Sequence, residues 1–284
     1  MKGGYFILNG RFHKETEAVF TVADLAKRAE GFCESFRAEH NEVLFAESIS
    51  SHLLATAATI GADLTGLIDE DGRLLRKDVS RLLNKNKLYL AAKIEIQIFP
   101  SDSKINMLLR AEEIPRGYYP TVEPGLLISI FRDQLQEIHE ISGYATSGLF
   151  VRQYAARRAK ELTQPNIILL NQKGNACETL DGSFAWLNQN QLFFTSEREG
   201  GYICAIREQV IQSAKVAGFI TVVIERISPD ELLQAEELFL YDACHGIQKV
   251  LGLEDRRYFS TKTILIVEKL SALARRDREE RITN

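Results

Sequence analysis

The pattern of apolar and polar residues in the first third of the chain is mainly that of β-strands. Residues 92–99 read AKIEIQIF, a strict alternation that predicts a half-buried strand. Residues 5–8 are apolar and are followed by Asn9-Gly10, a dipeptide that readily adopts the positive φ angles of a tight turn. The chain is therefore expected to open with a β-hairpin whose second strand covers residues 11–13.

Further strands and two helices are expected in the same region. Residues 31–38 and 42–45, separated by the polar pair His40-Asn41, predict a second hairpin. Residues 52–61 have helix-forming composition and end in a glycine, whereas residues 78–86 place apolar side chains at helical spacing. Strands mixed with helices in this way predict an N-terminal α+β domain.

A proline-rich segment separates this region from the rest of the chain. Residues 111–124 (AEEIPRGYYPTVEP) hold three of the six prolines, which favours extended backbone and disfavours helix. We predict an N-terminal domain over residues 1–117, an interdomain linker over 118–124 and a C-terminal domain over 125–284.

The C-terminal region alternates helical and strand-like patterns. Ser228-Pro229-Asp230-Glu231 is typical of a helix start, since the serine side chain can cap the first turn and acidic residues favour it. Helices are predicted over residues 148–162, 207–217 and 261–276, and strands over residues 166–170, 183–187, 191–195, 221–226 and 237–241. The mixed-sign charges of residues 275–281 are expected to form a solvated, frayed helix end.

The composition and charge of the chain argue against some classes of function. The chain has 284 residues, of which 45% are hydrophobic and 26% charged, and its formal net charge is −4. A mildly acidic chain with interspersed charges lacks the basic surface that nucleic acid or anionic membranes require, so neither is expected as a partner. The N-terminal segment predicts a strand and not a signal peptide, and no apolar run is long enough to span a bilayer. A cytoplasmic location follows.

The cysteines indicate a reduced protein without a metal site. Cys33, Cys177, Cys204 and Cys244 lie far apart and show no C-x-x-C spacing, which argues against a disulfide framework and against zinc. We expect them to be mostly buried. An Asp242, Cys244 and His245 group could in principle form an acid-oriented thiol and imidazole pair. On a strand, however, neighbouring side chains point to opposite faces, so Cys244 and His245 are not expected to meet.

Several segments resemble, in order and spacing, the class IV family of pyridoxal-phosphate (PLP) enzymes. Residues 30–37 (EGFCESFR) are similar to its D-G-x-F-E-T-x-R segment, and residues 166–178 to the strand, turn and strand that carry its glutamate. Residues 207–218, 235–240 and 246–247 resemble its G-I-T-R helix and its A-x-E-x-F-x-x-G-T strand. The family includes branched-chain and D-amino-acid aminotransferases and aminodeoxychorismate lyase.

The resemblance implies a fold and a chemistry. The fold is a two-domain α/β one, D-amino-acid aminotransferase-like, with a small N-terminal α+β domain and a larger C-terminal pseudo-barrel domain. PLP would lie in a cleft between them, usually in a homodimer that acts on an amino or keto acid. The chemistry needs a lysine amine to hold the cofactor as an imine.

That lysine is missing from the expected place. The spacing of the family puts it near residues 142–146, with Ala145 as the nearest equivalent, and no lysine occurs between Lys104 and Lys160. Lys173 is the nearest substitute along the chain. Glu178 corresponds to the glutamate that pairs with the pyridine nitrogen, and it is the residue of this set that the chain retains.

The phosphate-binding positions differ as well. By the resemblance they fall on His52, Ile206, Arg207 and Ala243, where His52 replaces an arginine and Asp242-Ala243 replaces Gly-Thr. Histidine cannot make the two-pronged phosphate contact of arginine, and Asp242 adds a negative charge. Backbone N–H groups at the start of the helix at Arg207 remain a candidate anion cradle.

Three hypotheses follow from the sequence. In the first, the protein is a catalytically degenerate homologue that binds PLP weakly or not at all and holds another small acid or a partner protein. In the second it is a working aminotransferase or aminodeoxychorismate-type lyase in which another amine substitutes. In the third, Asp242, Cys244 and His245 support an activity without PLP. Tyr118-Tyr119 could close over a ligand or pack against the hinge.

Overall fold

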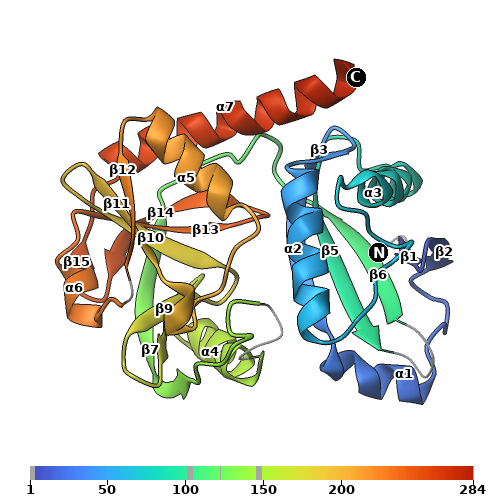
Figure 1. Ribbon diagram of the computed structural model, residues 1–284, viewed down its shortest axis with the longest axis horizontal. Helices are drawn as coiled ribbons and strands as arrows, with labels where there is room; N and C mark the ends of the chain where they lie inside the picture. The colour runs from blue at the N-terminus through green and yellow to red at the C-terminus, as the bar shows by residue number, and fades with distance from the viewer. Residues whose placement is uncertain (1–3, 101–104, 122, 145–148, 225, 284) are drawn as a thin grey trace. The chain divides into compact units, whose positions relative to one another are not determined.

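The computed structural model describes residues 4–100, 105–121, 123–144, 149–224 and 226–283. It divides into two compact units (Figure 1): unit 1 comprises residues 1–118 together with 274–284, and unit 2 comprises residues 119–273. Each unit is built on its own sheet, with helices packed against it. The predicted α/β fold class is confirmed. Within the described residues, no helix is both long and apolar enough to cross a membrane.

Unit 1 contains a six-stranded sheet in the order β2-β1-β6-β5-β3-β4, and every neighbouring pair in it is antiparallel. Its strands are β1 (Tyr5–Leu8), β2 (Arg11–Lys14), β3 (Phe32–Glu39), β4 (Glu42–Val43), β5 (Ala91–Pro100) and β6 (Ile105–Glu113). Both predicted hairpins are present, and their turns explain why. Asn9 and Gly10, like His40 and Asn41, all have positive φ, the geometry of a tight hairpin turn.

The helices of unit 1 are α1 (Val22–Lys27), the short 3-10 helix η1 (Arg28–Glu30), α2 (Ala46–Thr59) and α3 (Arg73–Asn86). In Figure 1, α2 lies across one face of the sheet near β5, and Ile49, Leu53 and Ala57 of this helix are buried. Both long helices begin earlier than predicted. Gly72 precedes α3 with φ +68°, and a Cβ there would lie 2.8 Å from the Ala46 oxygen, so this start needs a glycine.

Unit 2 contains a nine-stranded mixed sheet whose main path is β12-β11-β10-β13-β14-β7-β8-β9, with β15 paired to β14. Its strands are β7 (Leu126–Gln136), β8 (Ile167–Asn171), β9 (Ala176–Thr179), β10 (Ser183–Asn188), β11 (Gln191–Thr195), β12 (Ile220–Ile224), β13 (Glu237–Asp242), β14 (Gly246–Leu253) and β15 (Arg256–Arg257). Strand β9 stands at one end of this path but also contacts β10 and β11. The sheet therefore curls back on itself as a half-barrel, which brings distant strands to one site.

The helices of unit 2 are α4 (Leu149–Glu161), the 3-10 helix η2 (Glu197–Glu199), α5 (Arg207–Val216), α6 (Pro229–Leu233) and α7 (Thr261–Thr283), of which the residues from Ala274 onward group with unit 1. Helix α4 packs on β7 and β8, and α5 on β12. The predicted serine cap is present, because the Ser228 side chain accepts from the Glu231 N–H. The Glu231 side chain also accepts from the Ser228 N–H, so the two residues form a capping box.

The end of α7 differs from the prediction. The helix continues to Thr283 instead of ending near residue 276. Asp277 accepts a hydrogen bond from the Phe45 N–H at 2.9 Å and forms an ion pair with Arg281 at 2.7 Å, and the side chain of Arg281 is 17% exposed. The prediction of a frayed end was wrong because Asp277 and Arg281 have these partners in unit 1. The prediction of a solvated end holds for part of the segment, in which Arg275, Arg276, Glu279 and Glu280 are exposed.

Candidate functional site

Glu178 is one of the buried acidic residues of unit 2. It is on β9, fully buried, and faces α4, from which Arg152 reaches it. Arg152 Nε donates to Glu178 Oε1 at 3.0 Å and Arg152 Nη2 donates to Oε2 at 2.6 Å. The same guanidinium stacks over the Tyr202 ring at 5.1 Å. This two-pronged pair neutralises the carboxylate in a place from which water is excluded.

Thr195, at the end of β11, is hydrogen-bonded both to Cys177, the residue before Glu178, and to Arg207. The Thr195 hydroxyl donates to the carbonyl oxygen of Cys177 at 3.4 Å, next to Glu178, and the Thr195 carbonyl accepts from Arg207 Nη2 at 3.1 Å. The Arg207 guanidinium lies 5.7 Å from the Phe194 ring centroid. Burial raises the pKa of the Cys177 thiol well above its ordinary value, so this thiol is neutral at physiological pH.

The first backbone N–H group of α5 is hydrogen-bonded within the chain. Ile206 is the N-cap residue, is fully buried and provides no side-chain cap. The Arg207 N–H donates to the Cys204 carbonyl at 2.9 Å, and the Val210 N–H donates to the Ile206 carbonyl at 3.0 Å. Of the N–H groups expected to cradle an anion, that of Arg207 therefore already has an acceptor, and the Val210 bond is the first hydrogen bond of the helix itself.

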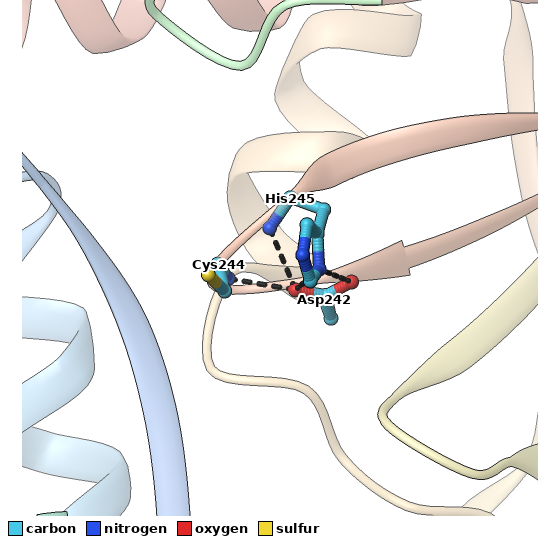
Figure 2. Close-up of side chains that lie close together, drawn as sticks. All are labelled: Asp242, Cys244 and His245. Carbon is cyan, nitrogen blue, oxygen red and sulfur yellow. Dashed lines mark hydrogen bonds and ion pairs between the residues drawn. The ribbon is translucent and has the colours of Figure 1, made fainter. Parts of the chain in front are cut away.

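Asp242 ends β13, and the turn that follows leads directly into β14. Its Oδ1 atom accepts hydrogen bonds from the N–H groups of Cys244 and His245, both at 2.7 Å, and its Oδ2 atom accepts from Gln248 Nε2 at 3.0 Å. Figure 2 shows the carboxylate with the backbone of Cys244 and His245 folded around it. The side chain of Asp242 is 8% exposed. The carboxylate thus occupies the anion position that the turn creates.

The turn also brings Cys244 and His245 together. His245 Nδ1 lies 3.0 Å from Asp242 Oδ2, and one polar side-chain atom from each of Asp242, Cys244 and His245 lies within 4.8 Å of the other two. The prediction that Cys244 and His245 would not meet was wrong. Both residues lie in the turn between Asp242 and Gly246, where the alternating directions of a strand do not apply.

Ala243 is held at the tip of the same turn by a tyrosine. The Tyr119 hydroxyl donates to the Ala243 carbonyl at 3.2 Å, and the Tyr119 side chain is almost fully buried. A Cβ at Gly246 would lie 2.5 Å from the Tyr119 ring, so the glycine allows this close packing. These contacts support the packing interpretation of Tyr119 and not the interpretation that it closes over a ligand.

His52 lies in unit 1, on α2. It is 9% exposed, and its Nε2 atom lies 2.9 Å from Glu34 Oε1 on β3. Its ring is therefore engaged with an acid.

The remaining candidates are placed as follows. Lys173 forms an ion pair with Glu199 at 3.1 Å, and its side chain is 55% exposed. The Tyr118 hydroxyl accepts from Arg278 at 3.1 Å. Ala145 lies outside the described residues. All four cysteines are free, and Cys33 is exposed whereas the other three are buried.

Sequence reasoning missed Arg152. It lies 26 positions from Glu178 and on a helix that carries other basic residues, among them Arg157 and Arg158. The helical pattern alone does not tell which of them turns inward. Its position three residues before Ala155 and seven before Ala159, on the apolar side of the helical pattern, is the sequence signal that could have indicated an inward-facing arginine.

The sequence matches the family model of amino-transferase class IV over residues 31–253. No curated protein sequence matches this chain significantly. Among solved structures, a branched-chain aminotransferase from Thermoproteus uzoniensis superposes with a TM-score of 0.80 at 20% identity, covering 96% of this chain and 94% of that chain.

Two further solved structures have the same fold. A hypothetical aminotransferase from Mycobacterium tuberculosis, in its PLP-bound form, has a TM-score of 0.81 at 13% identity and covers 96% of this chain and 100% of its own. The branched-chain amino acid aminotransferase from Escherichia coli has a TM-score of 0.78 at 17% identity, with 93% and 92% covered. The fold that the sequence resemblance implied is confirmed, and the chain belongs to the class IV aminotransferase family.

Proposed function

We propose that this protein keeps the class IV fold but has lost the lysine-dependent chemistry of the family, and that it binds PLP weakly or not at all. The sequence supports this proposal, because no lysine occurs between Lys104 and Lys160, where the Schiff-base residue is expected. The substitute Lys173 is an exposed partner of Glu199. A Schiff-base lysine instead needs a site that lowers its pKa so that it reacts as the free amine.

The observation that carries the proposal is the pairing of Glu178 with Arg152. By the family resemblance, this carboxylate should face a protonated ring nitrogen. Here both of its oxygens accept hydrogen bonds from one guanidinium, and the carboxylate is fully buried. A ring cation would have to displace Arg152, at the cost of leaving a buried guanidinium without its partner.

The phosphate positions fit no better. The carboxylate of Asp242 already accepts the hydrogen bonds of the turn N–H groups, and its negative charge would repel a phosphate placed there. His52 is engaged with Glu34, and the Arg207 N–H is bonded to Cys204. The residues present therefore do not fit the cofactor, and no catalytic step is assigned to it.

The ligand class we propose is a small amino or keto acid. Structures of relatives carry such molecules, since the Thermoproteus enzyme was solved with norvaline and the Mycobacterium protein with α-ketoglutarate and PMP. Arg207 is a suitable cation for the carboxylate of such a ligand, because its ion pair with Glu197 is weak. The two side chains are 3.8 Å apart and that of Glu197 is 61% exposed. We further propose a homodimer, as the resemblance implies, and a cytoplasmic location, as the sequence pattern led us to expect. Light scattering of the purified protein tests the assembly.

The test is a pair of titrations on the purified chain. PLP is expected to give no saturable absorbance band of a bound imine, whereas a panel of amino and keto acids is expected to include one that raises the melting temperature. The Arg207→Gln variant should lose that response, and Arg157→Gln, whose side chain is 79% exposed, should retain it. A stoichiometric imine band that an amino acid discharges would instead establish a working aminotransferase.

A further inference from the structure

The turn between β13 and β14 brings together three side chains that can bind a metal ion. Asp242 offers a carboxylate oxygen, Cys244 a sulfur and His245 a ring nitrogen, all within 4.8 Å of one another. Asp242 and Cys244 are buried, whereas the side chain of His245 is 45% exposed. The cluster thus has two protected ligands and one side open to solvent.

The distances suit an ion of the zinc class. Ligand atoms around tetrahedral zinc lie roughly 3.5 Å apart, given zinc to ligand distances of about 2.0 to 2.3 Å. His245 Nδ1 and Asp242 Oδ2 lie 3.0 Å apart, a separation now suited to a shared proton. Replacing that proton by an ion requires the two atoms to separate by a few tenths of an ångström and the Cys244 sulfur to approach by rotation of its side chain.

The carboxylate is already oriented for this role. Both turn N–H groups donate to its Oδ1 atom, and Gln248 Nε2 donates to Oδ2 from the side of β14. Ligating carboxylates in metal sites are commonly fixed by such outer hydrogen bonds. Oδ1 is thus held by the backbone, and Oδ2 keeps a lone pair that faces the imidazole.

We propose that Asp242, Cys244 and His245 bind a divalent cation of the zinc class, with the fourth position left to water or another ligand. Binding converts the Cys244 thiol to a thiolate and releases its proton to solvent, while the proton that lies between His245 Nδ1 and Asp242 moves to His245 Nε2, so that Nδ1 of the neutral imidazole can bind the ion. The carboxylate and the thiolate then balance the two charges of the ion, and the imidazole binds as the neutral ligand. The spacing rules that identify zinc sites in sequences do not recognise this cluster, because its ligands occupy positions i, i+2 and i+3 of one turn.

Cobalt titration of the full-length, chelator-treated protein tests the proposal. Cobalt(II) is expected to bind at one ion per chain, with a thiolate-to-cobalt charge-transfer band that zinc removes by competition. The Cys244→Ser variant should lose the band, and His245→Gln should weaken cobalt binding at least tenfold.

Matched controls are available at surface positions. Cys33→Ser and His139→Gln replace an exposed cysteine and an exposed histidine and should leave the titration unchanged. The exposed side chain of His245 makes His245→Gln informative even if the buried Cys244→Ser substitution prevents folding. Absence of saturable cobalt binding in the parent protein, or a band that survives both site substitutions, would overturn the proposal. Neither result bears on imine formation, so the proposed loss of lysine chemistry is tested separately.

Discussion

Two buried carboxylates of unit 2 are neutralised in different ways. Glu178 relies on one side chain, Arg152, which reaches it from α4. Asp242 relies mainly on the backbone of the turn that it begins, with two N–H groups at 2.7 Å. A side-chain partner can be removed by one substitution, whereas backbone donors remain when the acid is replaced. The first carboxylate should therefore be sensitive to loss of its partner, and the second should be exchangeable for another anion.

Breaking the Glu178 pair should have the largest effect. Arg152→Leu leaves a fully buried carboxylate without its guanidinium, and we expect a loss of about 3–5 kcal/mol in the free energy of unfolding. Urea denaturation at neutral pH measures it. The double variant Arg152→Leu with Glu178→Leu removes both charges and should recover most of the stability. A loss below about 1 kcal/mol in the single variant would show that the carboxylate does not depend on Arg152.

Replacing Asp242 should have an intermediate effect and add a new property. Asp242→Ala removes the acceptor of two backbone N–H groups, and we expect a loss of about 1–3 kcal/mol. Because the amides remain, added phosphate should raise the melting temperature of this variant but not of the parent protein. Asp242→Asn retains an oxygen acceptor and should show a smaller loss without the phosphate response. Equal phosphate responses in the parent protein and Asp242→Ala would contradict the account.

Glu199 is a third buried carboxylate of unit 2, and it accepts hydrogen bonds from the neutral side-chain amides of Asn171 and Asn175. Burial raises its pKa, but hydrogen bonds from Asn175, Asn171 and Lys173 outweigh this, so the pKa lies below the ordinary value. A depressed pKa in the folded state stabilises the protein above the pKa of the unfolded chain, and this contribution disappears as the pH falls through the folded value.

Replacing Glu199 should have the smallest effect on the free energy of unfolding. Glu199→Gln keeps one oxygen acceptor, and we expect it to lose about 1 kcal/mol at pH 7. It should also lose less stability than the parent protein as the pH falls below 4.5, the ordinary pKa of a glutamate side chain. Urea denaturation at a series of pH values measures both quantities, and identical pH profiles for the two proteins would contradict the assignment.

The local elements of the fold were predictable from sequence. The turns at Asn9-Gly10 and His40-Asn41 and the helix cap at Ser228 each depend on residues within one turn of one another, and all three appear as expected. Strands β7 and β14 were not predicted as strands from their pattern. They pair with each other in parallel across more than a hundred residues, which local periodicity does not report.

The candidate site shows the same limit. Glu178, His52 and Arg207 could be identified from the family resemblance, but their partners could not. Arg152 meets Glu178 only because α4 packs on β7 and β8, next to β9. The approach of Cys244 to His245 depends on where β13 ends, and strand boundaries are the least certain part of a pattern-based prediction.

The most direct test of the central claim is borohydride reduction of the protein in excess PLP, followed by peptide mapping. The account predicts no stoichiometric phosphopyridoxyl adduct on any one lysine, with only scattered low-level labelling of surface amines. A reduced adduct on one defined lysine, at one per chain, would contradict it and establish Schiff-base chemistry in this fold.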